Sequence, residues 1–296
     1  IREPMAGKRL QIHDSPSSQG GPSGFWLTNP DNFVRNNLAA DALGNGFWMA
    51  FPRMTMGLNM AVAMLPDRLP HGQFDSNVAH SNGAPGVLLN WAPVDAAGNV
   101  SPNQYIPTVD GRENDYTSMV PVSMRRIAIY KNAGGYANNV SIPDYKEWTF
   151  ADNVGVNVTG KVHMGTLARS LLVGQSLNNA SPYPNYWPYE KQSAFATYHS
   201  TLAMVDNTVI NFPFFDNQTS GAWKTDDYYT GAIDKGTVRN AGNRLIATNP
   251  GFRVLPPHMD GQPLANRHWT LSGALWDPYG YWGAKNNFHV YDVPFL

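Results

Sequence analysis

The chain has 296 residues, of which 42% are apolar, so it is long enough to bury a sizeable hydrophobic core. Lys and Arg total 21 against 22 Asp and Glu, and the formal charge of −1 provides no basic field of the kind that holds nucleic acid. Cys is absent, which excludes disulfides, thiolate metal sites, a Cys nucleophile and iron–sulfur clusters.

The sequence starts at Ile1 and not at a Met, and it has no basic n-region and no apolar signal segment. We therefore expect the chain to be the C-terminal part of a larger exported precursor, with any export signal upstream of Ile1. The longest mostly apolar run, Met54 to Leu65, contains Gly57 and Asn59 and is shorter than the roughly 20 residues of a spanning helix. We expect no transmembrane segment in this chain.

The composition favours turns over helices, because only 15% of the residues are charged while Gly (27), Pro (23) and Asn (29) are abundant. Short apolar runs alternate with Asn or Gly, a pattern typical of short strands between turns. The predicted strands are Phe47–Met49, Val87–Leu89, Ile127–Tyr130, Trp148–Phe150, Leu171–Val173, Leu202–Val205 and Thr208–Ile210.

Two segments resemble copies of one unit: Phe33-x-x-Asn36 precedes Gly46-Phe47-Trp48 much as Phe74-x-x-Asn77 precedes Gly86-Val87-Leu88. Further Asn corners, at Asn132, Asn153, Asn178 and Asn207, are separated by 21, 25 and 29 residues, a spacing that indicates stacked repeat units. In a parallel β-solenoid, Asn tolerates the left-handed backbone of each corner, and successive Asn side chains stack in a ladder. We expect Asn36 or Asn37, Asn77, Asn132 and Asn153 at such corners.

Three segments interrupt this pattern, and we interpret them as loop insertions. They are the polar segment 91–122, the aromatic and Pro-rich segment 180–198, and segment 214–236, which combines aromatic residues with Asp. The tail from about residue 255 reads as a closing unit after Pro256-Pro257. We find no linker, so we predict a single domain over residues 1–296.

The segment Phe25-Trp26-Leu27-Thr28-Asn29-Pro30-Asp31-Asn32, with Asn36 to Ala40 and Gly46-Phe47-Trp48 after it, resembles the G8-domain proteins, which include cell-migration-inducing hyaluronan-binding and transmembrane hyaluronidase proteins. Phe74 to Ser81, Ile127 to Asn132 and the tail Leu275–Pro278 to Asp292–Leu296 extend the resemblance. It covers most of residues 24–160 and then the tail.

The resemblance implies a right-handed parallel β-helix, secretion or surface display, and association with glycosaminoglycan-type polysaccharides. It also implies that the G8 domain itself would lie upstream of Ile1. The lack of Cys departs from the animal members and indicates a microbial relative.

Polysaccharide cleavage requires paired carboxyl groups, or a base with a cation, around one sugar. On a β-helix such groups come from neighbouring coils, so no local motif is expected. We select Asp75 as a catalytic candidate from acidic residues that include Asp110, Glu113, Asp115 and Asp152. From the eight histidines we select His80, which follows the Asn77 corner, as a candidate general base. The alternative is that Asp75 caps a turn and that His80 is an ordinary hydrogen-bonded histidine.

The sequence identifies no cofactor, although a divalent cation such as calcium would suit carboxylate oxygens. The candidate metal ligands are His13, Asp14, Asp226 and Asp227. Aromatic rings that stack on sugars are the candidate glycan contacts, and these are Trp187, Tyr189, Trp223, Tyr228 and Tyr229. The alternative is that these rings pack over the side of the solenoid. Five Asn-x-Ser/Thr sequons also occur, as expected by chance in an Asn-rich chain.

These residues predict a mostly β, extracellular, periplasmic or cell-surface protein that binds or cleaves glycosaminoglycan-like polysaccharide. If it is an enzyme, we expect a polysaccharide hydrolase or lyase. The alternative function is a noncatalytic structural or assembly component, because a solenoid offers long flat faces and open ends to other protein chains.

Overall fold

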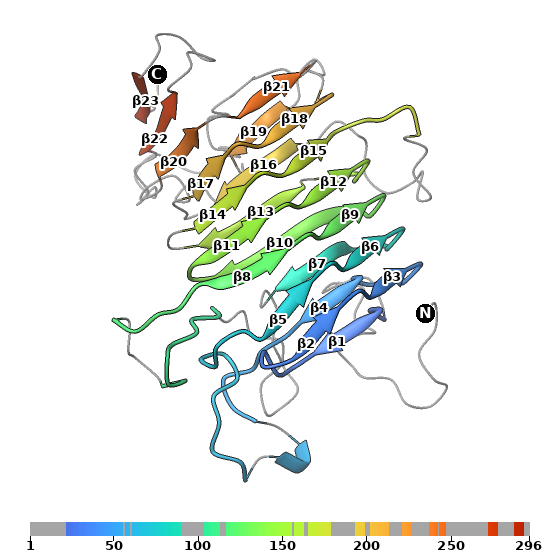
Figure 1. Cartoon of the computed structure of the whole chain (residues 1–296), viewed down its shortest axis with the longest axis vertical. Coiled ribbons are helices and arrows are strands. Elements are labelled where there is room, and N and C mark those ends of the chain that lie inside the picture. Colours follow the sequence, from blue (N-terminus) through green and yellow to red (C-terminus); the bar gives the residue numbers. More distant parts are fainter. Residues whose placement is uncertain are drawn as a thin grey trace, which may run out of the picture.

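A computed structural model describes residues 22–55, 57–59, 61–89, 104–112, 117–155, 157–162, 165–178, 193–198, 202–212, 221–225, 237–241, 243–246, 272–277 and 287–292 (Figure 1). In these residues the fold is mostly β, as predicted, with one short 3₁₀ turn at Gly57–Asn59. The chain passes through three sheets in turn, and each strand up to β18 pairs in parallel with the strand three places later. The result is a stack of short coils with a β-helix-like fold.

The strands of the three sheets follow a fixed order along the stack. Sheet A contains β1 (Phe25–Leu27), β4 (Phe47–Met49), β7 (Pro85–Leu89), β10 (Gly134–Val140), β13 (Val158–Val162), β16 (Ser193–Tyr198) and β19 (Gly221–Thr225). Sheet B contains β2 (Phe33–Arg35), β5 (Gln73–Asp75), β8 (Val122–Arg125), β11 (Pro143–Lys146), β14 (Gly165–Ala168), β17 (Leu202–Val205), β20 (Thr237–Ala241), β22 (Ser272–Asp277) and β23 (Asn287–Asp292). Sheet C contains β3 (Leu38–Ala40), β6 (Val78–His80), β9 (Ala128–Tyr130), β12 (Thr149–Ala151), β15 (Leu171–Val173), β18 (Thr208–Ile210) and β21 (Arg244–Ile246).

All seven strands predicted from the sequence lie within or overlap observed strands. The predicted alignment of Phe47-Trp48 with Val87-Leu88 is confirmed. The alignment of Phe33 with Phe74 is wrong by one residue, because Phe33 pairs with Gln73 and Val34 pairs with Phe74. A shift of one residue in a strand moves a side chain to the opposite face. Phe33 is accordingly 74% exposed, whereas Phe74 is buried.

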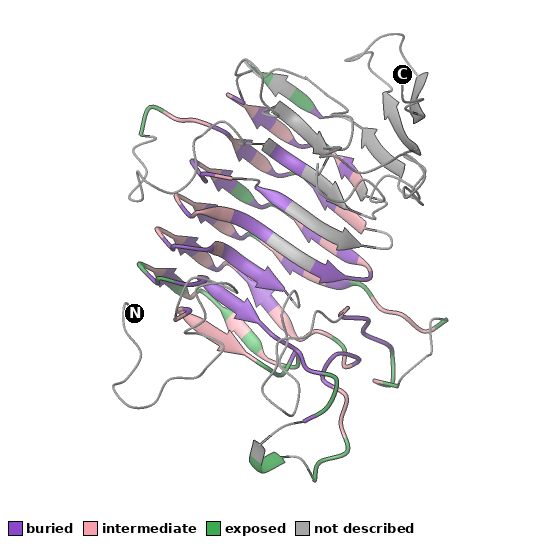
Figure 2. Cartoon of the chain, turned by 180° about the vertical axis from the view of Figure 1, so that it is seen from behind, coloured by how far each residue is buried: buried purple, intermediate pink, exposed green. Residues whose placement is uncertain are grey.

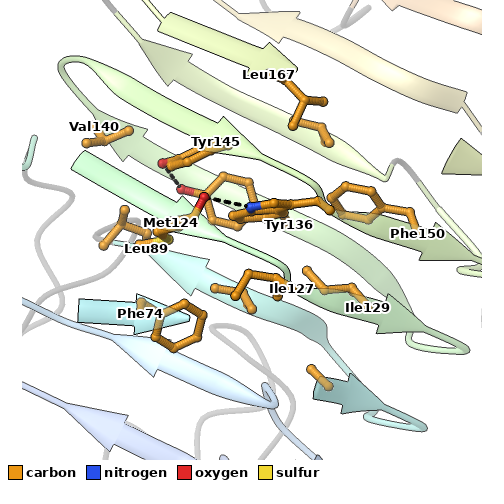
Figure 3. Close-up of a cluster of buried hydrophobic side chains, with 14 of the residues drawn as sticks. Phe74, Leu89, Met124, Ile127, Ile129, Tyr136, Val140, Tyr145, Phe150 and Leu167 are labelled. Atoms are coloured by element: carbon orange, nitrogen blue, oxygen red, sulfur yellow. Dashed lines mark hydrogen bonds between the residues drawn. The ribbon is translucent and has the colours of Figure 1, made fainter. Parts of the chain in front are cut away.

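Each three-residue strand of sheet C points its middle side chain into the stack, so an alternating pattern recurs from coil to coil (Figure 2). The interior is filled by aromatic and aliphatic residues from all three sheets. At its centre Tyr136 and Tyr145 share a hydrogen bond through their hydroxyls, and the Trp148 indole donates to the Met124 carbonyl at 3.1 Å (Figure 3). Burial raises the pKa of both Tyr136 and Tyr145, so these hydroxyls stay neutral donors and acceptors.

The corner between sheets B and C contains two residues in each of the seven described coils. In the second coil these are Ser76 and Asn77, and the Asn77 side chain is fully buried. Its Oδ1 accepts from the Asn37 backbone N–H at 3.0 Å, and its Nδ2 donates to the Val34 carbonyl at 2.8 Å. Asn207 and Asn243 repeat this arrangement further along the stack.

A second Asn ladder lies where sheet C leads into sheet A. Asn82, Asn132 and Asn153 follow one another there, each accepting a backbone N–H from the preceding coil. Their amides also donate to the carbonyls of Ala39, Ala79 and Ile129. The predicted corner positions are therefore confirmed for Asn77, Asn132 and Asn153. Asn178, in contrast, is exposed and stands outside both ladders.

In the coils from β1 to β18, long insertions occur at the two other corners. Residues 50–72 and 90–121 connect sheet A to sheet B, and residues 174–192 connect sheet C to sheet A. Two predicted insertions were too long, because segment 180–198 includes β16 and segment 214–236 includes β19. The predicted closing unit contains β22 and β23, which pair antiparallel. The division of the chain into a single domain stays a prediction.

Replacing Asn77 by Leu should lower the free energy of unfolding by on the order of 1–3 kcal/mol, because the Asn37 N–H and the Val34 carbonyl lose their buried partner. Chemical denaturation measures this loss. Asn178→Leu is the matched control, since its side chain is exposed. An unchanged midpoint for Asn77→Leu would contradict the structural role of the ladder.

Candidate functional site

The first residue of the corner between sheets B and C forms a column of exposed or partly exposed side chains along the stack. This corner column consists of Asn36, Ser76, Arg126, Glu147, Arg169 and Asp206, all with φ between 50° and 63°. The residues before them are in register from strand to strand, so the column members lie one above another. The left-handed turn keeps each of these side chains on the outside while the next residue points into the interior.

Positive and negative side chains alternate along this column from Arg126 to Asp206, and an ion pair connects the column to Asp75 of sheet B. Arg126 pairs with Asp75 through its Nη2, and Asp75 also accepts from the Ser76 hydroxyl at 3.0 Å. Glu147 lies between two cations, with its oxygens 3.9 Å from Arg126 Nη1 and 3.1 Å from Arg169 Nη2. The two arginine side chains and Glu147 are each more than 40% exposed. Pairs this exposed contribute little to stability.

Four more charged residues extend this surface over sheet B. Asp144 lies 2.8 Å from Lys146 Nζ and 3.6 Å from Arg125 Nη2. Arg35 lies over the exposed Phe33 ring at the N-terminal end of the sheet. We define the charged patch as Arg35, Asp75, Arg125, Arg126, Asp144, Lys146, Glu147, Arg169 and Asp206, in which five cations face four carboxylates.

The two catalytic candidates lie on different sheets. Asp75 ends β5 in sheet B, where it is 9% exposed and paired with Arg126. His80 ends β6 in sheet C, where its ring stacks on Tyr130 with centroids 4.8 Å apart and its Nδ1 lies 3.1 Å from Ser81 Oγ. None of the described contacts joins Asp75 to His80. Their catalytic role stays a prediction.

Most of the other candidate residues lie outside the described part of the chain. These are the metal candidates His13, Asp14, Asp226 and Asp227 and the glycan candidates Trp187, Tyr189, Tyr228 and Tyr229. Trp223 lies in β19 with its backbone paired to Phe195, a residue that is buried in the interior. Within the described ranges, no group of three or more His, Asp or Glu side chains is placed to share a metal ion.

The sequence analysis missed Arg126, Glu147 and Arg169. The signal that could have identified them is a charged residue directly after a strand and directly before a buried corner residue, as in Arg126-Ile127, Glu147-Trp148 and Arg169-Ser170. Two sequon asparagines, Asn139 and Asn157, are buried in the structure and so are closed to glycosylation. The described residues contain no helix with the length and hydropathy that crossing a bilayer would require.

A second polar cluster fixes the two insertions between sheets A and B to each other. Asp67 and Arg68 form a buried ion pair at 2.9 Å, and the Asp67 carbonyl accepts from the Ile106 N–H. Tyr105 donates its hydroxyl to the Leu69 carbonyl at 2.7 Å, and its ring lies 4.8 Å from Phe51. The insertion predicted to be a polar binding loop therefore has a buried segment at Tyr105–Thr108.

Sequence comparisons agree with the fold. Residues 4–87 match the family model described as CEMIP beta-helix. This part of the chain is similar to the CEMIP beta-helix family. The mouse (Mus musculus) protein "Cell migration-inducing and hyaluronan-binding protein" is 27% identical over 151 residues, covering 46% of this chain and 11% of the relative.

Two shorter matches add to this similarity. Fibrocystin-L of Mus musculus is 37% identical over 68 residues, which are 23% of this chain and 2% of that protein. "Cell surface hyaluronidase CEMIP2" of Homo sapiens is 33% identical over 70 residues, which are 23% of this chain and 5% of that protein. The chain thus spans only a small part of the relatives it matches, and the resemblance predicted from the sequence is confirmed.

The titration of His71, in the insertion between β4 and β5, should make the free energy of unfolding depend on pH. Desolvation lowers the pKa of His71 to about 4, an effect that a backbone hydrogen bond at Gly72 partly offsets. Between pH 6.5 and about 4 the unfolded chain binds a proton at this site that the folded chain does not, so stability should fall as the pH falls through this window.

Denaturation at stepped pH values tests this dependence. His71→Gln should flatten the slope between pH 6.5 and about 4, because a side chain without a titrating group replaces the imidazole. His80→Gln is the matched control, since it makes the same replacement at a histidine on sheet C, outside the insertions. Equal slopes for the native chain and His71→Gln would contradict the assignment.

Proposed function

We propose that this chain is an extracellular or cell-surface protein that associates with glycosaminoglycan-type polysaccharide through the charged patch. By their names, one of the similar proteins binds hyaluronan and another is a cell-surface hyaluronidase. We propose further that the coils form a right-handed solenoid, as crossover connections between parallel strands do in nearly all proteins.

The spacing of the corner column is the observation that carries this proposal. Arg126 and Arg169 occupy the same corner position two coils apart, with Glu147 between them. Strands two apart in a sheet are separated by roughly 9.6 Å, which is about the length of a disaccharide. A polymer with one carboxylate per disaccharide, such as hyaluronan, would present successive carboxylates at this spacing, and Glu147 would accept from sugar hydroxyls between them.

Catalysis is a separate part of the proposal. If the chain cleaves its polysaccharide, it would act as a hydrolase or lyase with Asp75 or His80 transferring a proton. Asp75 already has a cation beside it in Arg126, and this ion pair favours a structural carboxylate over a free general base. Trp187, Tyr189, Trp223, Tyr228 and Tyr229 remain proposed glycan contacts, and His13, Asp14, Asp226 and Asp227 remain proposed cation ligands.

A noncatalytic structural role is the second candidate. The outer face of sheet C carries partly exposed aliphatic residues along the stack and ends in Leu38 and Ile246, which are 59% and 41% exposed. Flat apolar faces of this kind suit contact with other protein chains of a surface assembly. Self-association measured by light scattering, without any polysaccharide binding, would favour this role.

Neutralising both corner arginines should weaken hyaluronan binding. Arg126→Gln with Arg169→Gln should raise the Kd roughly tenfold, because two charge-assisted contacts are lost. The remaining affinity should respond less steeply to added salt. Isothermal titration with hyaluronan oligosaccharides measures both effects.

The matched control is Arg112→Gln, since the Arg112 side chain is 79% exposed and pairs with Asp110 outside the charged patch. This variant should bind as the native chain does. Equal affinity of the double variant and the native chain would reject the charged patch as the binding surface.

A further inference from the structure

On the outer face of sheet C, a pair of stacked rings is followed along the stack by a small residue. We call this feature the aromatic step, and it lies outside the charged patch. His80 and Tyr130 stack in parallel, with their ring planes 10° apart, and both are partly exposed. The same outward column continues with Ala151 and then Val173. Because the methyl group of Ala151 is much shorter than the Tyr130 side chain, the ring face toward Ala151 has no side chain of its own column stacked on it.

The dimensions of this step suit one sugar ring. Tyr130 and Val173 lie on strands two apart, at a separation of roughly 9.6 Å. The floor between them is formed by Ala151 and by Thr149, whose side chain is exposed. Thr149 thus provides a hydroxyl beside an aromatic face, and this pairing matches the apolar C–H face and the hydroxyl groups of a pyranose.

A cation stands at the edge of the step. Lys131 follows Tyr130 directly and occupies the left-handed corner between sheets C and A, with φ of 55°. Among the described residues Lys131 forms no ion pair. The nearest acidic neighbour in that corner column, Asp152, is buried, and both of its oxygens accept from Ser176 at 2.7 Å. The ammonium group is therefore available to an external anion.

We propose that Tyr130, Lys131, Thr149 and Ala151 form a binding site for a uronic-acid residue of a polysaccharide. The sugar ring lies against the Tyr130 face over Ala151, its carboxylate pairs with Lys131, and Thr149 bonds to a hydroxyl. This inference rests on the proposed polysaccharide-binding function and adds a second contact surface to it. Arg126 and Lys131 flank strand β9, five residues or roughly 16 Å apart, so one oligosaccharide crossing sheet C reaches both cations.

Ala151→Leu is the sharpest test, because it fills the step while keeping the ring and both cations. Position 151 is partly exposed and outside the interior, so the fold should be retained, and a thermal unfolding midpoint checks this. Binding of hyaluronan hexasaccharide, followed by isothermal titration, should weaken roughly fivefold to tenfold in Ala151→Leu and in Tyr130→Ala. Tyr130→Phe is the matched control and should bind within about twofold of the native chain.

Charge specificity gives a second readout. Lys131→Gln should weaken binding of the hexasaccharide and leave binding of its carboxyl-reduced, neutral form unchanged. The step is rejected if Ala151→Leu and Tyr130→Ala bind as the native chain does. If those variants bind normally while Arg126→Gln with Arg169→Gln binds weakly, the step fails and the proposed function stands. If the native chain binds no uronic-acid oligosaccharide, both fail.

Discussion

The fold depends on satisfying the backbone groups at the corner between sheets B and C. A left-handed, non-glycine residue there costs about 1–2 kcal/mol, and the buried residue that follows has an N–H directed at the neighbouring coil. The side-chain oxygens of Asn77, Asn207 and Asn243 accept that N–H, and their amide nitrogens donate to a backbone carbonyl. The Ser170 hydroxyl accepts the N–H of Trp148 in the same way. These bonds hold the coils in register, and the register aligns every outward column on the surface.

Interior and exterior perform separate tasks in this stack. The interior is neutral, with the hydroxyls of Tyr136 and Tyr145 bonded to each other and the Trp148 indole bonded to backbone. The charged residues of the corner column are exposed, and exposed pairs add little to folding free energy. Substitutions among Arg126, Glu147 and Arg169 can therefore change ligand preference without affecting the interior that supports them.

The sequence predicted the type of structure better than its alignment. Short apolar runs and Asn corners identified seven strands and two members of the second ladder. The adjacent Asn36 and Asn37 both fit a corner, and aligning Asn36 with Asn77 shifted the Phe33 end of the first repeat by one residue. The corner column could not be predicted from the sequence for a related reason. Aligned residues such as Ser76, Arg126 and Glu147 are separated by unequal insertions, so no fixed period links them in sequence.

The constant two-residue corner has a consequence for how such a chain can change in length. An inserted residue there would rotate every following strand out of phase and point interior side chains toward water. The connection between β4 and β5 already contains more than twenty residues, while the one between β10 and β11 contains two, and both rejoin the same sheet. Grafted peptides or whole modules can thus be accommodated on those edges, whereas the edge between sheets B and C changes only by exchanging one amino acid for another.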